Sequence, residues 1–199
     1  MKLLLADPDR DFLKAYQTLL SLEGHTVTVC FEGTETVKTA AAEAFDAVIL
    51  SAALPRVPCA DIISLLQEKG IPSVVLTRRK ISAALLLNTP LANAYLPFPF
   101  LPEELLSLLQ RVSDLAGSGE TFPVGDARID VSGFCIAGTS VRLTAGEIEV
   151  LQSLSAGSLT AQSRLSPYMN ALNQKFALAG KSVRATYQNR EGYRLVTSI

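Results

Sequence analysis

Acidic and hydroxyl side chains that could do chemistry follow separate apolar segments in the first half of the chain: Asp7, Asp9, Ser51 and Thr77. Carboxylates bind divalent cations or cap helices, and a hydroxyl becomes a nucleophile only beside a base. The sequence identifies no base for Ser51, so we do not expect covalent catalysis there. Two acids alone are too few oxygen ligands for firm Mg²⁺ binding. Loop acids, one of them a helix N-cap, are the simpler interpretation of Asp7 and Asp9.

Other residue types that carry chemistry are sparse. The three cysteines, Cys30, Cys59 and Cys135, are scattered and lack CxxC spacing, and His25 is the only histidine. Reduced thiols are therefore expected rather than a disulfide framework or a metal site. The apolar start of the chain is too short for a signal peptide, and polar residues interrupt the other apolar runs well short of a membrane span. We expect a cytoplasmic protein that is not an enzyme and uses no cofactor or metal.

The elements that position these side chains alternate between strands and helices. This alternation predicts a doubly wound α/β fold with a five-stranded parallel sheet, whose ligands lie at the carboxyl ends of the strands. Asp7, Ser51, Thr77 and Phe98 follow four of those ends. The predicted strands are Lys2–Ala6, Thr26–Cys30, Ala47–Leu50, Ile71–Leu76 and Ala94–Leu96, and the predicted helices include Thr34–Glu43, Asp61–Lys69, Ser82–Asn88 and Pro102–Val112.

The pattern changes after a short Gly/Ser segment. The sequence predicts a first domain over residues 1–113, a linker over 114–121 and a second domain over 122–199. Short alternating segments around Ser132-Gly133 predict a small antiparallel sheet. Thr144 and Glu147 form a capping box that starts one helix, and Pro167–Leu178 has the pattern of another. A β-hairpin is expected around Gln188–Gly192, which makes the second domain a small α+β unit.

Charge differs between the two halves. Residues 1–116 carry ten Lys/Arg and thirteen Asp/Glu, whereas residues 117–199 carry eight and six. The second half is therefore mildly basic, which weakly favours a nucleic-acid partner for it.

The first 112 residues resemble the receiver domain of response regulators. The resemblance rests on the segments KLLLAD at 2–7, FDAVIL at 45–50, IPSVVLT at 71–77 and YLPFPF at 95–100. It implies a CheY-like fold. In receivers, acids after the first strand and an aspartate after the third bind Mg²⁺, the latter accepts a phosphoryl group, and a lysine before the fifth-strand proline holds its oxygens.

This chain departs from that pattern at the reacting positions. Ser51 occupies the phosphoryl-acceptor position, Phe98 the lysine position and Pro8 the position of the second acid. Asp7 and Asp9 make a residual acidic pocket. A serine cannot form an acyl phosphate, and Phe98 places an apolar ring where a cation belongs. We therefore expect a pseudo-receiver that is not phosphorylated, in which the switch positions, Thr77 and Tyr95, have structural roles, and in which Pro99 follows a cis peptide.

Residues 122–199 resemble the winged helix-turn-helix domain of OmpR/PhoB-type regulators. The resemblance rests on VRLTAGEIEVL at 141–151 and GYRL at 192–195. It implies an atypical response regulator that binds double-stranded DNA, with the 167–178 helix in the major groove and the hairpin as the wing. The candidate DNA-binding residues are Asn170, Asn173, Gln174, Lys175, Lys181, Arg184, Arg190 and Arg194.

Two points remain open in the sequence. The 167–178 helix lacks arginine, so a protein-interaction adaptor built from two degenerate domains is the alternative to a DNA-binding regulator. The resemblance also implies a homodimer through the fourth-helix, fifth-strand, fifth-helix face, where Leu85, Leu86 and Leu108 are expected to form an apolar patch. The opposing interpretation is that these leucines pack the core.

Overall fold

The computed structural model describes residues 1–87, 90–156, 165–188 and 192–197. Contacts divide the chain into two compact units: Met1–Lys80 with Ala92–Ser113, and Ile81–Leu91 with Asp114–Ile199. The segment Ile81–Leu91, which the sequence places inside the first domain, is thus grouped with the second unit. The elements of the chain are β1 (Lys2–Ala6), α1 (Arg10–Leu22), β2 (Thr26–Cys30), α2 (Gly33–Ala42), β3 (Ala47–Ser51), α3 (Cys59–Glu68), β4 (Ser73–Thr77), α4 (Ala83–Leu86), β5 (Ala94–Pro97), α5 (Pro102–Gly117), β6 (Thr121–Val124), β7 (Ala127–Asp130), β8 (Cys135–Ile136), α6 (Ala145–Ser155), α7 (Ser166–Leu178), β9 (Val183–Gln188) and β10 (Gly192–Thr197).

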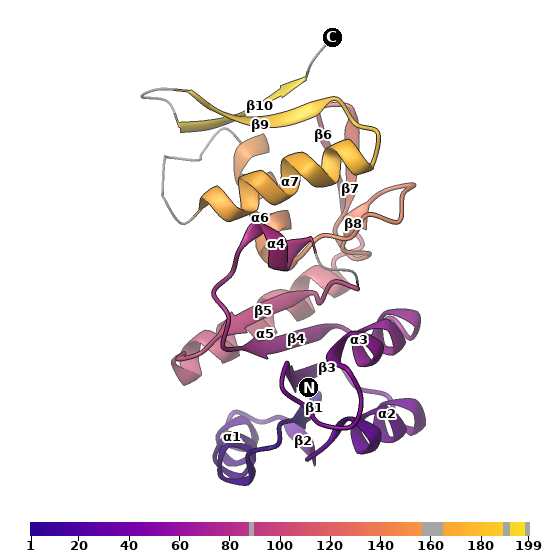
Figure 1. The fold of residues 1–199 in the computed structure, drawn as a ribbon, viewed down its shortest axis with the longest axis vertical. Helices are drawn as coiled ribbons and strands as arrows, with labels where there is room; N and C mark the ends of the chain where they lie inside the picture. Colours follow the sequence, from indigo (N-terminus) through magenta and orange to yellow (C-terminus); the bar gives the residue numbers. More distant parts are fainter. Residues whose placement is uncertain (88–89, 157–164, 189–191, 198–199) are drawn as a thin grey trace. The chain divides into compact units, whose positions relative to one another are not determined.

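The first unit is a parallel sheet in the order β2-β1-β3-β4-β5. Every residue of β3 and β4 is buried, as continuous apolar strands covered on both faces require. Helices α2 and α3 lie on one face of the sheet, and α1 and α5 lie on the other (Figure 1). The predicted CheY-like α/β fold is confirmed.

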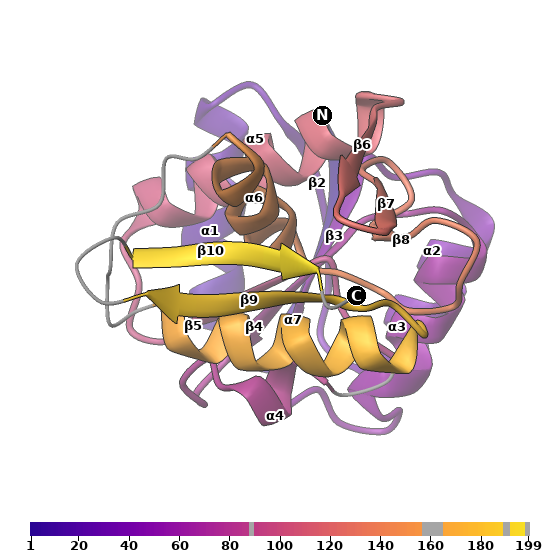
Figure 2. The same cartoon turned by 90° about the horizontal axis from the view of Figure 1, so that it is seen from above.

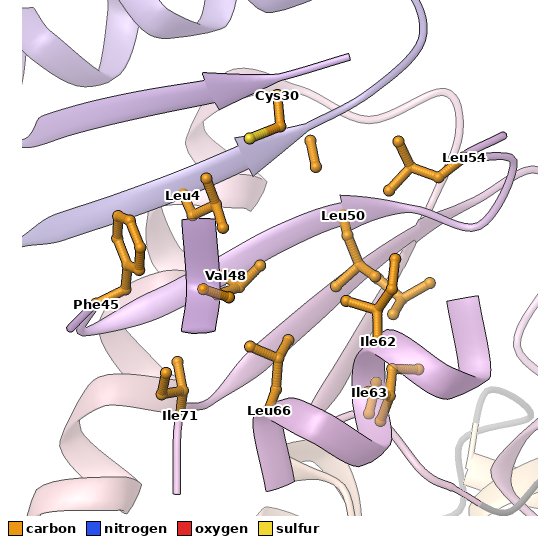
Figure 3. Close-up of a cluster of buried hydrophobic side chains, with 14 residues drawn as sticks. Leu4, Cys30, Phe45, Val48, Leu50, Leu54, Ile62, Ile63, Leu66 and Ile71 are labelled. Carbon is orange, nitrogen blue, oxygen red and sulfur yellow. The ribbon is translucent and has the colours of Figure 1, made fainter. Parts of the chain in front are cut away.

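One hydrophobic cluster fills the space between the sheet and α3 (Figure 3). Leu4, Val48 and Leu50 point from the strands toward Ile62 and Leu66 of α3. Because successive strand side chains alternate between faces, their neighbours in β1 and β3 point to the other side of the sheet. Both layers are buried, which fixes the register of the strands and the places where they end.

The strand order brings four carboxyl ends together. In the β1–β3 pair Ala6 faces Leu50, in the β3–β4 pair Ser51 faces Leu76, and in the β4–β5 pair Thr77 faces Pro97. The residues that follow these strands therefore share one edge of the sheet. The predicted cis peptide is also present, between Phe98 and Pro99.

The second unit combines two small antiparallel sheets with helices. Strands β6, β7 and β8 form one sheet, and β9 and β10 form a hairpin. The hairpin runs alongside α7 (Figure 2). This arrangement has the α+β character that the sequence predicts. Helix α5 continues through Gly117, so it includes Asp114–Gly117 of the predicted linker, because no proline or glycine interrupts the helix between Pro102 and Gly117.

Helix α4 is shorter than predicted. Ser82 caps it as expected, since its hydroxyl accepts a hydrogen bond from the Leu85 amide at 3.3 Å. The helix ends at Leu86, and the predicted end at Asn88 lies outside the described residues. Within the second unit, α4 packs against α7 (Figures 1 and 2).

Candidate functional site

A pocket of about 300 Å³ lies at the carboxyl ends of the parallel strands in the first unit. Its floor and walls come from the β1–α1, β3–α3 and β4–α4 segments and from the residue after β5. The sequence-predicted residues Asp7, Asp9, Ser51, Thr77 and Phe98 all line it, together with Pro8, Phe12, Ala52, Ala53, Leu76, Arg78 and Arg79.

The two acids have different environments. Asp7 is buried, and its Oδ1 accepts the Asp9 amide at 2.8 Å. Burial raises the pKa of Asp7, while the hydrogen bonds from the Asp9 amide and the Ser51 hydroxyl act in the opposite direction. Asp9 caps α1, because its Oδ1 accepts the amides of Asp11 at 3.0 Å and Phe12 at 3.1 Å. The N-cap interpretation is thus correct for Asp9, whereas Asp7 is not a solvated loop acid.

Ser51 sits at the end of β3 with its side chain buried. Its Oγ accepts the Ala53 amide at 3.3 Å, and its hydroxyl is hydrogen-bonded to Asp7. The neighbouring acid holds this hydroxyl in place but leaves it neutral. The geometry offers no carboxylate at the position where a receiver carries its phosphoryl acceptor.

Phe98 joins an aromatic cluster at the pocket wall. Its ring centroid is 5.8 Å from that of Phe12 and 4.7 Å from that of Phe100. The Arg78 guanidinium carbon lies 5.7 Å from the Phe98 centroid, within the range of a cation–π contact. Arg78 and Arg79 were not among the predicted site residues. The sequence feature that could have identified them is a pair of arginines directly after Thr77, the last residue of β4.

Thr77 and Tyr95 each have a structural partner. Buried Thr77 accepts the Arg79 amide on its Oγ1 at 3.0 Å. The Tyr95 hydroxyl accepts the Ala92 amide at 3.3 Å, and its ring packs against the hydrophobic cluster of Figure 3. These contacts give both switch positions a role in holding their own loops.

In the second unit, Lys175 occupies the protein interior. Its Nζ lies 2.8 and 2.7 Å from the two carboxylate oxygens of Glu147, and only 4% of its side chain is exposed. Glu147 also accepts the Thr144 amide at 2.7 Å in the confirmed capping box of α6. Burial lowers the pKa of Lys175 and raises that of Glu147, and each charge counteracts the shift of the other. The prediction that Lys175 contacts DNA phosphate is therefore wrong.

Asn173 has a structural role as well. Its Nδ2 donates to the Ala185 carbonyl at 2.9 Å, and its Oδ1 accepts the Ala185 amide at 2.7 Å. This pair of bonds fastens β9 to α7 and uses one donor and one acceptor of the amide, so we give Asn173 a structural role and do not carry it into the proposed DNA-binding set. Asn170 and Gln174 are exposed on α7.

The predicted basic residues of the wing differ in exposure. Arg194 is exposed on β10, and Lys181 and Arg184 are half-buried. The Arg184 guanidinium donates to the carbonyls of Lys181 at 2.8 Å and Val183 at 2.7 Å. Arg190 lies outside the described residues.

Two aromatic residues that the sequence prediction missed also lie on the hairpin. Tyr187 and Tyr193 face each other across β9 and β10, with their ring centroids 5.3 Å apart.

Among the described residues, no group of three or more His, Cys, Asp or Glu side chains is placed to hold a metal ion. None of the helices that the structure describes combines the length and apolar composition needed to span a membrane.

Comparison with known proteins relates the sequence to response regulators. It is 32% identical over 128 residues to the response regulator MprA of Mycolicibacterium vanbaalenii, covering 61% of this chain and 55% of MprA. It is 27% identical over 173 residues to the transcriptional regulatory protein PrrA of Mycobacterium leprae, covering 82% of this chain and 74% of PrrA. The chain spans about half the length of the MprA proteins it matches. No protein-family model matches it.

Solved structures match the fold. A mutant of RitR superposes with a TM-score of 0.69 and 17% identity over 99% of both chains. The chemotaxis response regulator CheY4 of Vibrio cholerae matches 56% of this chain and 97% of its own, with a TM-score of 0.50 and 26% identity. The first likeness concerns the fold alone, across both units, and the second concerns the receiver.

Proposed function

We propose, from its similarity to the regulators MprA and PrrA and from its receiver fold, that this chain is an atypical response regulator of the OmpR/PhoB type, a cytoplasmic DNA-binding transcription regulator that acts without aspartyl phosphorylation. One observation supports the second half of this statement above all. Ser51 stands at the β3 end where a receiver needs its acceptor carboxylate, and Phe98 fills the place of the cation that holds the phosphoryl oxygens. Residues 1–113 would act as the pseudo-receiver and residues 122–199 as the DNA-binding domain.

DNA binding would use fewer residues than the sequence suggested. Asn170 and Gln174 are exposed amide side chains on α7, and both residue types can read adenine in the major groove. Arg194, Lys181 and Arg184 would contact phosphates beside the wing, and Arg190 keeps its place in the proposal from the sequence. With Lys175 and Asn173 removed from the set, we expect modest affinity and strong dependence on salt. A homodimer would fit paired half-sites on DNA.

A salt series of DNA binding tests this function. The full chain should bind duplex DNA with affinity that falls steeply as salt rises, because bound phosphates release counterions. Arg194→Ala should weaken binding to all sequences alike and lower the salt slope by about one unit. Arg128→Ala is the matched control, since Arg128 is exposed on β7 and donates to Thr121 instead. Equal binding by the Arg194 variant and the parent would reject the wing assignment.

The alternative function, a protein-interaction adaptor, is favoured by one specific feature. The only lysine of α7 is buried against Glu147, so the exposed side chains of the described helix carry no positive charge. If the full chain shows no DNA binding even at low salt, the adaptor becomes the better proposal.

A further inference from the structure

The pocket of the first unit differs in charge from a phosphoryl-transfer site. Its lining includes two carboxylates, two guanidinium groups and two phenyl rings, from Asp7, Asp9, Arg78, Arg79, Phe12 and Phe98. The ionised charges cancel in sum but belong to different segments: the acids follow β1 and the arginines follow β4. A pocket of about 300 Å³ is also in the size range of sites for small molecules.

The acidic part suits a cation that brings several hydrogen-bond donors. Asp7 is 6% exposed and its carboxylate is hydrogen-bonded by the Asp9 amide and the Ser51 hydroxyl. Burial makes the charged form of Asp7 costly, so a bound ammonium group would lower that cost. A metal ion is a poorer occupant, because a hard cation needs several oxygen ligands and Ser51 offers a neutral hydroxyl where a receiver has a carboxylate.

The basic part suits a carboxylate. Arg78 and Arg79 are exposed at the pocket, and within the part of the chain that the structure describes neither guanidinium forms an ion pair within 4.0 Å. The charge of Arg78 does act on Asp7, where it opposes the rise in pKa that burial causes. Arg78 lies over the Phe98 ring, which limits the directions its guanidinium can take. Guanidinium groups bind carboxylates through paired, charge-assisted hydrogen bonds.

The remaining wall is apolar. Phe12 and Phe98 line the pocket, and Tyr16 and Phe100 pack behind them with centroid separations of 4.4 Å and 4.7 Å respectively. These rings would contact the apolar part of a ligand whose charged ends reach the acids and the arginines. A simple anion would face Asp7 and Asp9, and a simple cation would face the two arginines.

We propose that this pocket binds a small zwitterion of the amino-acid class with an apolar side chain, with its ammonium group at Asp7 and Asp9, its carboxylate at Arg78 and Arg79, and its side chain against Phe12 and Phe98. This site goes beyond the proposed DNA-binding function. It gives the pseudo-receiver a chemical input in place of phosphate, and it stands whether or not the second unit binds DNA.

Titration calorimetry on the full chain tests the site. The probes are L-phenylalanine, L-tyrosine, L-tryptophan and L-leucine. For each amino acid that binds, two analogues are then titrated, one without the amino group and one without the carboxylate. For L-phenylalanine these are 3-phenylpropionate and 2-phenylethylamine. We expect one amino acid or more to bind with one site per chain, and each analogue to bind at least about tenfold more weakly, the effect of losing one charge-assisted contact.

Three variants locate the binding. Asp7→Asn and Arg78→Gln should each weaken it by about tenfold or more. Lys80→Gln is the matched control, because Lys80 is exposed two positions from Arg78 and does not line the pocket. The proposal is overturned if none of the four amino acids binds at millimolar concentration, if an analogue or inorganic phosphate binds as tightly, or if both pocket variants bind like the parent. The comparison of analogues uses the parent chain, so it does not depend on the folding of any variant.

Discussion

Lys175 shows how burial changes the role that a charged residue can have. The sequence pattern places Lys175 on the polar side of the predicted 167–178 helix. In the structure its ammonium group instead contacts the carboxylate of Glu147, which lies 28 positions earlier in the chain. Glu147 is fully buried and also completes the cap of α6. The pair therefore joins the start of α6 to the last turn of α7 and contributes to the interior of the second unit rather than to its surface.

Removing one partner of this pair should be costly. Lys175→Met leaves the Glu147 carboxylate buried without a counter-charge, and we expect the free energy of unfolding to fall by about 3–5 kcal/mol. The double variant Glu147→Gln/Lys175→Met should recover most of that loss, because the glutamine is neutral and still accepts the Thr144 amide. Urea unfolding of the two variants measures the difference. Equal destabilisation in both would contradict a buried charge pair.

The raised pKa of Asp7 leads to a prediction of how the stability of the first unit depends on pH. Because burial raises its pKa in the folded state, folding favours the protonated form, and stability falls as pH rises from the unfolded pKa through the folded one. Asp7→Asn removes the charge and should make the chain more stable than the parent near neutral pH. At pH values below the unfolded pKa of an aspartate, about 4, this advantage should disappear. Urea unfolding at both pH values tests it, and an advantage that grows on acidification would refute the assignment.

Helices and strands that depend on neighbouring residues could be predicted from the sequence. Contacts between segments far apart in the sequence could not. The buried strands, the Ser82 cap and the Thr144 capping box each depend on residues within a few positions. The βα alternation then predicted a parallel sheet with its ligand site at the carboxyl ends of the strands, so the residues of the pocket could be predicted together. The contact of Lys175 with Glu147 and the packing of α4 on α7 join distant segments, and no local pattern marks them.

The placement of α4 also corrects the predicted apolar patch. Leu86 and Leu108 are 1% and 7% exposed, and Leu85 is half-buried. The three leucines do not form an exposed surface, which agrees with the interpretation that they pack the core. The homodimer stays a proposal, and these side chains no longer provide the reason for it.

Helix α4 should report on the second unit rather than on the receiver sheet. Leu86→Ala creates a cavity at a buried position, with a typical cost of about 2–5 kcal/mol. We expect faster hydrogen exchange of the α7 amides and little change in β1 and β3. Leu66→Ala is the matched control, because Leu66 is equally buried in the first unit and should affect β3 instead. If Leu86→Ala accelerates exchange in β4 and β5 but not in α7, α4 belongs with the sheet.

At the scale of the whole molecule, the first unit has a CheY-like receiver fold and the second is a small α+β unit. The first unit has the parallel sheet and the Phe98–Pro99 cis peptide that the resemblance implies, and in the proposed function Ser51 and Phe98 stand in place of the phosphoryl acceptor and the cation. The second unit contains helix α7 and the β9–β10 hairpin, with Asn170 and Gln174 exposed on that helix. We therefore propose that the chain differs from phosphorylated receivers in its input signal and not in the fold of its first unit.

The most direct test of this account is the intact mass of the full chain after incubation with acetyl phosphate and Mg²⁺. A phosphorylatable receiver treated in parallel is the positive control. The account predicts no phosphoryl adduct on this chain, because Ser51 cannot form an acyl phosphate and Phe98 cannot hold the phosphoryl oxygens. A stoichiometric adduct that disappears in Ser51→Ala would contradict it.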